Sequence, residues 1–176
     1  MANKGLTHVY YGDGKGKTTA ALGLALRASG CGKKVVIVQF LKEMQSSELK
    51  QLQHLSGIKI FRGAATTKFS NEMKVTEKED TTRIHNANLK QALELVVTGQ
   101  CDVLILDEAL DAYQLGMLDE SLFSSIIKDK PDMLELIITG HKPIEWVIKN
   151  ADYITEMVKH RHPFDLGVTG RRGIEF

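Results

Sequence analysis

Three runs rich in apolar residues constrain the fold of this chain more than any other feature of its sequence. They cover residues 34–40, 102–107 and 133–139, and the first reads Lys-Val-Val-Ile-Val-Gln-Phe. A strand that is apolar on both faces must be covered on both faces, which is typical of a parallel sheet between helices. Segments of helical length separate these runs, so the sequence predicts an α/β fold with a mostly parallel central sheet.

The segments around these runs supply the other predicted elements. Strands are expected at residues 6–11, 58–61 and 153–157, and helices at 18–28, 46–55, 76–99, 119–127 and 143–149. Thr76 and Glu79 have the spacing of a capping box, and Asp119 is expected to cap the helix that follows it. Residues 63–74 have no period and predict a loop. The length of 176 residues predicts a single domain over residues 1–176.

A glycine-rich segment joins the first predicted strand to the first predicted helix. Residues 12–19 read Gly-Asp-Gly-Lys-Gly-Lys-Thr-Thr. Glycines let the backbone turn so that successive N–H groups point into one anion-sized hollow, and the following helix adds its positive N-terminal end. Lys17 would reach the outer phosphates of a nucleotide, and the Thr18 hydroxyl would bind Mg²⁺. The segment therefore predicts a phosphate-binding loop.

The loop departs from the strict Walker A spacing, which requires glycine five residues before Gly16. Tyr11 stands there, and the first glycine is Gly12. A glycine-rich turn without a ligand is the alternative, but the strand-to-helix position favours phosphate binding. Arg27 is a further candidate for a phosphate contact, or else a surface arginine. The residues predicted to bind the nucleotide within the loop are Gly12, Asp13, Gly14, Lys15, Gly16, Lys17, Thr18 and Thr19.

An acidic pair follows the second apolar run, where Asp107 ends the run and Glu108 comes next. A buried parallel strand delivers such carboxylates to the C-terminal edge of the sheet, beside the phosphate loop. One carboxylate would hold a metal ion directly or through water, and the other would order a water or a second ligand. A pair that merely caps the next helix is the alternative interpretation.

The composition argues against several other classes of protein. The chain has 23 Lys and Arg against 22 Asp and Glu, so its net charge of +1 gives no general attraction to nucleic acid or an anionic membrane. No apolar run approaches the roughly 20 residues of a membrane span. Cys31 and Cys101 stand far apart, which excludes a disulfide scaffold. We therefore expect a cytoplasmic protein without nucleic-acid or membrane partners.

The residues by themselves leave the reaction open. The chain lacks the Asn-Lys-x-Asp motif of guanine specificity, which disfavours a GTPase switch. A P-loop ATPase switch or regulatory module is one alternative, and a small-molecule kinase with Arg171 and Arg172 as clamp candidates is another. His160 and His162 have a spacing that suits metal ligands on a strand, but a solvated basic tail is favoured because no further ligand has zinc-like spacing.

Several separated motifs together resemble the ATP:corrinoid adenosyltransferases of the cobalamin pathway. The motifs are Tyr-Gly-Asp-Gly-Lys-Gly-Lys-Thr-Thr-Ala-Ala at 11–21, Val-Gln-Phe-Leu-Lys at 38–42, Ile-Leu-Asp-Glu at 105–108, Ile-Thr-Gly at 138–140, Ala-Asp at 151–152, His-Pro-Phe-Asp-x-Gly at 162–167 and Gly-Ile-Glu at 173–175. The match spans nearly the whole chain in order, and the family has the same shifted glycine. The expected fold is thus a P-loop NTPase-like (RecA-like) three-layer sandwich.

The resemblance implies adenosyl transfer from ATP to a reduced corrinoid. In this family Co(I) attacks the 5′ carbon of ATP and inorganic triphosphate leaves, so no protein nucleophile is needed. ATP is expected to lie reversed in the loop, with its outer phosphate where other nucleotidases hold the inner one. Lys17 and Glu108 are the expected catalytic residues. Thr18, Glu108 and the supporting Asp107 are the expected ligands of Mg²⁺ or Mn²⁺.

The resemblance also bears on the corrinoid and on partner proteins. The corrinoid-facing aromatic residues of the family fall in the loop at 63–74, where this chain has Phe69 and no tryptophan. Longer relatives carry an extra N-terminal segment that covers the active site, whereas only residues 1–5 precede the first predicted strand here. A homodimer is expected, together with an electron-donor protein such as a flavodoxin-like reductant.

Overall fold

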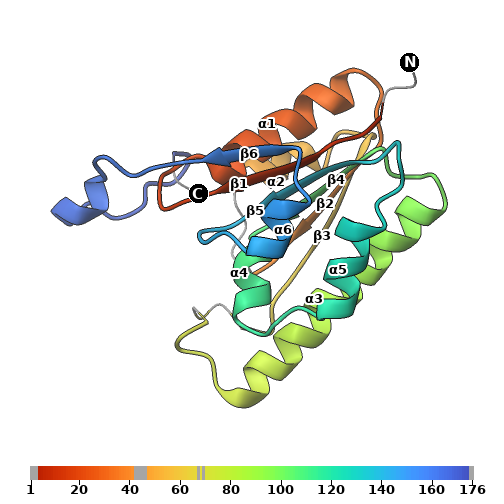
Figure 1. The fold of residues 1–176 in the computed structure, drawn as a ribbon. Helices are drawn as coiled ribbons and strands as arrows, with labels where there is room; N and C mark the ends of the chain where they lie inside the picture. Colours follow the sequence, from red (N-terminus) through yellow and green to blue (C-terminus); the bar gives the residue numbers. More distant parts are fainter. Residues whose placement is uncertain (1–3, 42–46, 67, 69, 175–176) are drawn as a thin grey trace.

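The computed structural model describes residues 4–41, 47–66, 68 and 70–174, and its centre is one six-stranded sheet (Figure 1). The strands are β1 (Thr7–Tyr11), β2 (Val35–Gln39), β3 (Ile58–Arg62), β4 (Val103–Asp107), β5 (Glu135–Thr139) and β6 (Tyr153–Glu156). Their order across the sheet is β3-β2-β4-β5-β1-β6, and each neighbouring pair is parallel. The predicted α/β fold with a parallel central sheet is confirmed.

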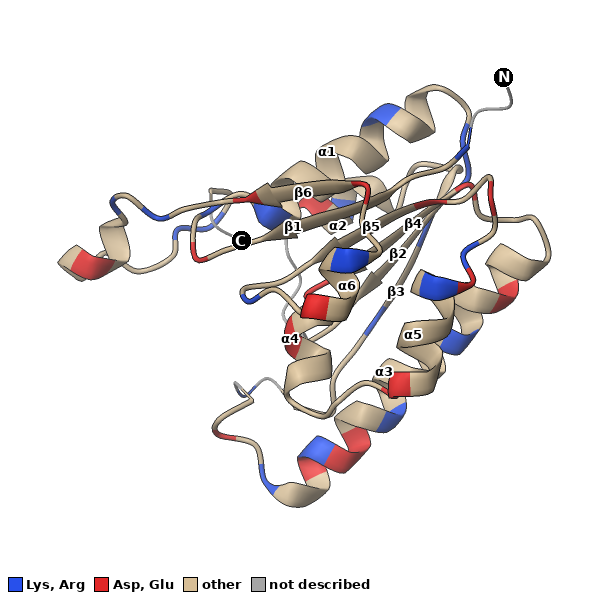
Figure 2. Cartoon of the chain, in the orientation of Figure 1, with Lys and Arg blue, Asp and Glu red and all other residues tan. Residues whose placement is uncertain are grey.

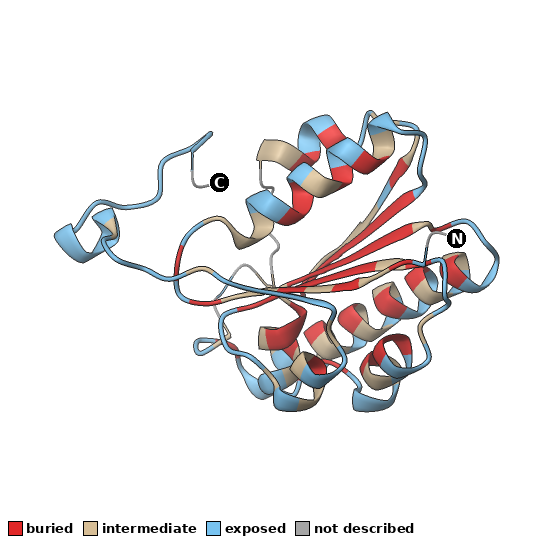
Figure 3. Ribbon diagram, turned by 45° about the horizontal axis from the view of Figure 1, so that its top comes forward, coloured by how far each residue is buried: buried red, intermediate tan, exposed pale blue. Residues whose placement is uncertain are grey.

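Helices connect the strands and cover both faces of the sheet. They are α1 (Lys17–Gly30), α2 (Ser47–Leu52), α3 (Val75–Val97), α4 (Ala109–Gln114), α5 (Glu120–Lys128) and α6 (Glu145–Lys149), followed by the 3₁₀ turn η1 (Pro163–Leu166). Figure 3 shows buried residues on the sides of the helices that face the strands, so that the molecule has three layers. Acidic and basic residues are interspersed along α3 (Figure 2).

The alternation of side chains along the strands divides the core between the two faces of the sheet. In β2, Val35 and Ile37 pack in the cluster that contains α1 and α2. Their neighbours Val36 and Val38 pack in the cluster that contains α3, α4, α5 and α6. Successive residues of a strand point to opposite faces, which explains why four consecutive residues of β2 are buried and apolar.

The start of α3 differs from the prediction. Lys74, rather than Thr76, is the N-cap, and its N–H donates to the Glu77 carboxylate at 2.7 Å. Lys68 also donates to Glu77, at 2.8 Å, so tertiary contacts from the preceding loop favour this carboxylate over that of Glu79. The predicted cap at Asp119 is confirmed, because its carboxylate accepts the Leu122 N–H at 3.0 Å.

Two segments and one tryptophan complete the description of the fold. The described residues of the segment 63–74 form no helix or strand, as predicted. The short helix α4 was not predicted, since six residues give too little periodicity to detect. Trp146 packs in the core with Tyr113 and Phe123, at distances of 5.8 and 5.6 Å between ring centroids.

Among the described residues, no helix combines the length and the apolar character needed to cross a membrane.

A buried histidine connects α3 to the ends of two other elements. His85 is fully buried, and its Nε2 accepts the N–H of Leu41, just beyond β2, at 3.1 Å. Its Nδ1 lies 3.1 Å from the Met117 carbonyl oxygen and donates to it. Because the two contacts require one donor and one acceptor nitrogen, the ring is neutral in the folded protein. Burial lowers the pKa of His85 to about 4.

We expect His85 to make the protein less stable as the pH falls from 6.5 towards 4. In this range the unfolded chain protonates the ring, with an ordinary pKa of 6.5, while the folded protein resists protonation. The difference lowers the free energy of unfolding by up to roughly 3 kcal/mol. Urea unfolding of His85→Gln should show a shallower pH dependence than that of the control His54→Gln, which alters an exposed histidine. Equal slopes for both variants would contradict this prediction.

Candidate active site

The predicted phosphate-binding loop lies between β1 and α1, at the C-terminal edge of the sheet. The Gly12 N–H donates to the His141 carbonyl oxygen at 3.0 Å, and the Gly14 N–H donates to the Met157 carbonyl oxygen at 2.7 Å. A Cβ at Gly12 or Gly14 would lie 2.3 or 2.6 Å from that Met157 oxygen. These two glycines are therefore required by the close approach of the backbone after β6, besides any role towards phosphate.

The shifted first glycine has a structural reason. Tyr11 is the last residue of β1 and pairs with Glu156 of β6, so the strand continues through the position where strict Walker A spacing requires glycine. Asp13 follows the turn, and its carboxylate accepts the Lys159 N–H at 2.9 Å. This hydrogen bond holds the pKa of Asp13 below its usual value. Asp13 therefore connects the loop to the C-terminal segment.

Lys17 and Thr18 begin α1 and lie at the centre of the candidate site. The Lys17 ammonium donates to the Gly14 carbonyl oxygen at 2.8 Å, which places the ammonium across the loop. The Thr18 hydroxyl donates to the Asp107 carboxylate at 2.9 Å. Lys15 and Thr19 are exposed on either side of these two residues. The structure thus brings the predicted loop residues and the first acidic residue together.

Asp107 is a fully buried carboxylate held by three side chains from three different elements. Thr18 of α1 and Thr139 of β5 donate to Oδ1, at 2.9 and 2.8 Å. Gln39 of β2 donates to Oδ2 at 3.0 Å. A buried charge is costly unless it is hydrogen-bonded, and these donors meet that requirement. Gln39 and Thr139 lie in the motifs noted in the sequence, but neither was predicted as a site residue.

Glu108 has an unusual backbone conformation at the junction of β4 and α4. Its φ and ψ of 61° and 23° lie in the left-handed region, which is disfavoured for residues other than glycine. The Glu108 N–H donates to the Thr139 hydroxyl at 2.9 Å, which helps to hold this conformation. Although Glu108 is the N-cap of α4, its side chain makes no capping hydrogen bond. The carboxylate is therefore not explained by helix capping.

The donor set suits a hard divalent cation. The Thr18 hydroxyl and the Asp107 carboxylate are within 2.9 Å of each other, and Glu108 is adjacent in sequence to Asp107. Oxygen ligands of this kind are those that Mg²⁺ prefers. The Gln39 Oε1 atom is also buried and makes no hydrogen bond within the described residues. The chemistry of these residues fits the predicted metal site.

Other predicted residues lie outside this cluster. Arg27 is exposed in the last turn of α1, distant along the helix from Lys17 at its start. Phe69 lies outside the described residues. His162 uses its ring to accept the Phe164 N–H at 3.2 Å in the C-terminal segment. No cluster of three or more potential metal ligands of the His, Cys, Asp or Glu type occurs in the described part of the chain.

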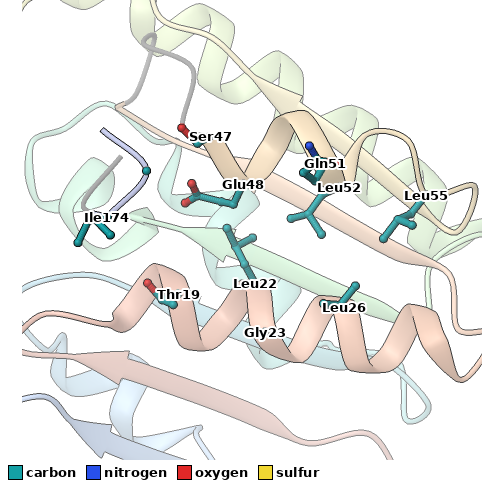
Figure 4. A pocket seen from close by; sticks show the side chains of 11 residues that line it. Thr19, Leu22, Gly23, Leu26, Ser47, Glu48, Gln51, Leu52, Leu55 and Ile174 are labelled. Atoms are coloured by element: carbon teal, nitrogen blue, oxygen red, sulfur yellow. The ribbon is translucent and has the colours of Figure 1, made fainter. Parts of the chain in front are cut away.

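A pocket of about 690 Å³ opens beside the loop, between α1, α2 and the C-terminal segment (Figure 4). It begins at Thr19, the last residue of the loop segment 12–19, and Ile174 lies at the same end. Leu22 and Leu26 of α1 and Leu52 of α2 line its length. Pockets of this size and apolar character bind small organic molecules. Sequence reasoning missed this pocket, because its walls come from three separate segments.

The fold and the site together define an α/β protein of the P-loop nucleotide-binding class. The sequence profile described as "ATP:corrinoid adenosyltransferase BtuR/CobO/CobP" matches residues 3–176. The chain therefore belongs to the ATP:corrinoid adenosyltransferase family, whose members transfer the adenosyl group of ATP to a reduced corrinoid, and it is a transferase of the cobalamin pathway.

Individual relatives agree with this assignment. The chain is similar to the corrinoid adenosyltransferases of Escherichia coli K12 (31% identical) and Pseudomonas aeruginosa (30%), and to the corrinoid adenosyltransferase CobA of Salmonella typhimurium (33%). Each match covers 98% of this chain, and 86%, 84% and 86% of the respective relatives. Among solved structures, the ADP form of the Aeropyrum pernix ORC2 protein aligns with a TM-score of 0.47 at 13% identity, over 91% of this chain and 44% of that one.

We expect Thr139→Val to destabilise the site while keeping the shape of the side chain. The variant removes one donor to the buried Asp107 and the acceptor of the Glu108 N–H. Leaving such groups unpaired costs about 1–3 kcal/mol each, so the midpoint of urea unfolding should fall. Thr155→Val in the exposed strand β6 is the matched control and should unfold like the unaltered protein. A Thr139 variant as stable as this control would disprove the role of the network.

Proposed function

We propose that this chain transfers the 5′-deoxyadenosyl group of ATP to the Co(I) centre of a corrinoid by direct displacement. The cobalt would supply the electron pair of the new Co–C bond. The bond between C5′ and the bridging oxygen would break, and inorganic triphosphate would leave with its electron pair. The observation that carries the proposal is the contact of the phosphate loop, through its residue Thr18, with Asp107 at one edge of the sheet.

The protein residues would position the phosphates and balance their charge. The loop N–H groups and Lys17 would bind the triphosphate chain, with ATP in the reversed orientation that the family resemblance implies. Thr18, Asp107 and Glu108 would hold Mg²⁺ or Mn²⁺, which neutralises phosphate charge when bound. No protein nucleophile is required, because the corrinoid supplies the attacking atom. Lys17 and Glu108 are thus our candidates for the catalytic residues.

We also propose that the pocket beside the loop receives the adenosine part of ATP. It is continuous with the loop through Thr19, and its apolar walls suit the faces of a purine base. Ser47, Glu48 and Gln51 of α2 line the same pocket and offer polar groups for the sugar hydroxyls and the base. Arg27 follows Leu26 in the sequence but does not itself line the pocket, so its contact with ATP stays a prediction.

Further features support the expected partners and location. Ile154, Val158, Phe164 and Leu166 are exposed apolar residues in β6 and the segment beyond it, which extends away from the sheet (Figure 1). Such exposed apolar surface supports a homodimer.

Both cysteines are free, which supports a cytoplasmic location. Reduction of the corrinoid to Co(I) would come from an electron-donor protein such as a flavodoxin-like reductant.

The bond of ATP that is cleaved tests the proposed reaction. Incubation with Mg·ATP and chemically reduced cobalamin should yield triphosphate and a light-sensitive Co–C product. Lys17→Ala should lower the rate by roughly 100-fold or more, because it removes a cation that stabilises the leaving triphosphate. Lys90→Ala, which alters an exposed residue of α3, is the control. Release of ADP instead would contradict adenosyl transfer and indicate a kinase or an ATPase.

Filling the pocket tests the proposed position of adenosine. Gly23 lines the pocket, and a Cβ there would meet no atom within 4 Å, so Gly23→Phe should fold normally and occupy the space. We expect the KM for ATP to rise about tenfold or more, which corresponds to a loss of about 1.4 kcal/mol of binding free energy. Gly30→Phe is the matched control, because Gly30 is the last residue of the same helix and a Cβ there also meets no atom within 4 Å. An unchanged KM in the Gly23 variant would exclude this pocket as the adenosine site.

A further inference from the structure

A histidine that the proposed reaction has not yet used lies beside the phosphate loop. His141 comes two residues after β5, and its carbonyl oxygen accepts the N–H of Gly12, the first loop glycine, at 3.0 Å. Its side chain is 60% exposed, so the ring is accessible to a ligand. This placement puts an imidazole at the edge of the site, on a segment hydrogen-bonded to the loop.

Asp111 of α4 holds both the backbone and the ring of His141. The His141 N–H donates to the two carboxylate oxygens at 3.2 and 3.0 Å, and the ring Nδ1 lies 3.1 Å from Oδ2. With Nδ1–H donating to Asp111, the other ring nitrogen, Nε2, makes no hydrogen bond within the described residues. Asp111 therefore fixes the orientation of the ring and leaves Nε2 available.

Close packing sets the geometry of this pair. A Cβ at Gly140 would lie only 2.4 Å from the Leu110 Cβ and 3.0 Å from the Asp111 Oδ2. The end of β5 and the start of α4 are thus in contact at the position just before His141. Any larger residue at position 140 would separate the carboxylate from the imidazole, so the pair depends on this contact.

The charges that act on the ring come from three elements. Asp111 of α4 raises the pKa of His141, chiefly through its hydrogen bond. Glu108, between β4 and α4, also raises it, whereas burial and Lys17 of α1 lower it. The net effect is a raised pKa. The same charges show that the ring is within electrostatic range of the candidate catalytic residues.

We propose that His141 is a further catalytic residue, whose Nε2–H, oriented by Asp111, donates to the oxygens of the triphosphate group as it leaves. This inference rests on the proposed adenosyl transfer. Triphosphate gains negative charge when the C5′–O bond breaks, so a cationic donor beside Lys17 stabilises the transition state more than bound ATP. His141 would complement Lys17, whose ammonium lies across the loop and donates to the Gly14 carbonyl oxygen.

The pH dependence of this contact follows from the direction of the pKa shift. The protonated ring binds an anion more strongly than the neutral ring, because the hydrogen bond is then charge-assisted. The contribution of His141 is therefore fully present at low pH and is lost as the pH rises through its raised pKa. Asp111→Asn keeps the side-chain size but removes the charge, so the loss should occur at lower pH.

Binding of inorganic triphosphate, in the presence of Mg²⁺, tests the proposal by titration calorimetry between pH 6 and pH 8.5. His141→Gln should bind roughly tenfold more weakly than the unaltered protein at pH 6, and the difference should shrink as the pH rises. Comparison at each pH cancels the titration of triphosphate itself. His160→Gln, which alters an exposed histidine in the C-terminal segment, is the control and should match the unaltered protein.

The outcomes separate this inference from the proposed function. If His141→Gln binds triphosphate like the unaltered protein at every pH, the role of His141 is overturned while adenosyl transfer stands. If triphosphate binding depends on His141 but no adenosylated corrinoid forms, the anion contact stands and the proposed reaction fails. If the unaltered protein does not bind triphosphate at all, both are overturned.

Discussion

The hydrogen bonding of one buried carboxylate holds the candidate site together. Asp107 is removed from solvent at the end of β4, and it accepts hydrogen bonds from Thr18, Thr139 and Gln39. A buried charge without such partners would cost several kcal/mol. The same three contacts join α1, β5 and β2 to β4, so the requirement to satisfy Asp107 also aligns the phosphate loop with the acidic pair.

The strand order explains why β5 has such a central position. β1, which leads into the loop, and β4, which leads into Asp107, are not neighbours, because β5 lies between them. Thr139 at the end of β5 contacts the β4 side of this gap, by donating to Asp107 and accepting from the Glu108 N–H. His141, two residues further on, accepts from the loop and is held by Asp111. One strand end thus contacts both halves of the site.

Much of the fold and the centre of the site could be predicted, because they depend on local pattern. The apolar runs and the glycine-rich loop are continuous segments whose character is visible in the sequence. Gln39, Thr139 and His141 could not be assigned in this way, since their partners are distant in the chain and depend on the strand order. The predicted capping box of α3 was wrong for the same reason, because Lys68 stabilises the carboxylate of Glu77 from outside the helix.

The sequence by itself determined the α/β class, the position of the phosphate loop and the identity of the acidic pair, Asp107 and Glu108, that follows the apolar run of β4. These features follow from periodicity and from residue types that have few other uses. Only the tertiary structure decided that Gly12 and Gly14 must admit the backbone of Met157, and that an apolar pocket opens beside the loop. Both depend on packing between segments far apart in the chain, whose distance a linear pattern does not contain.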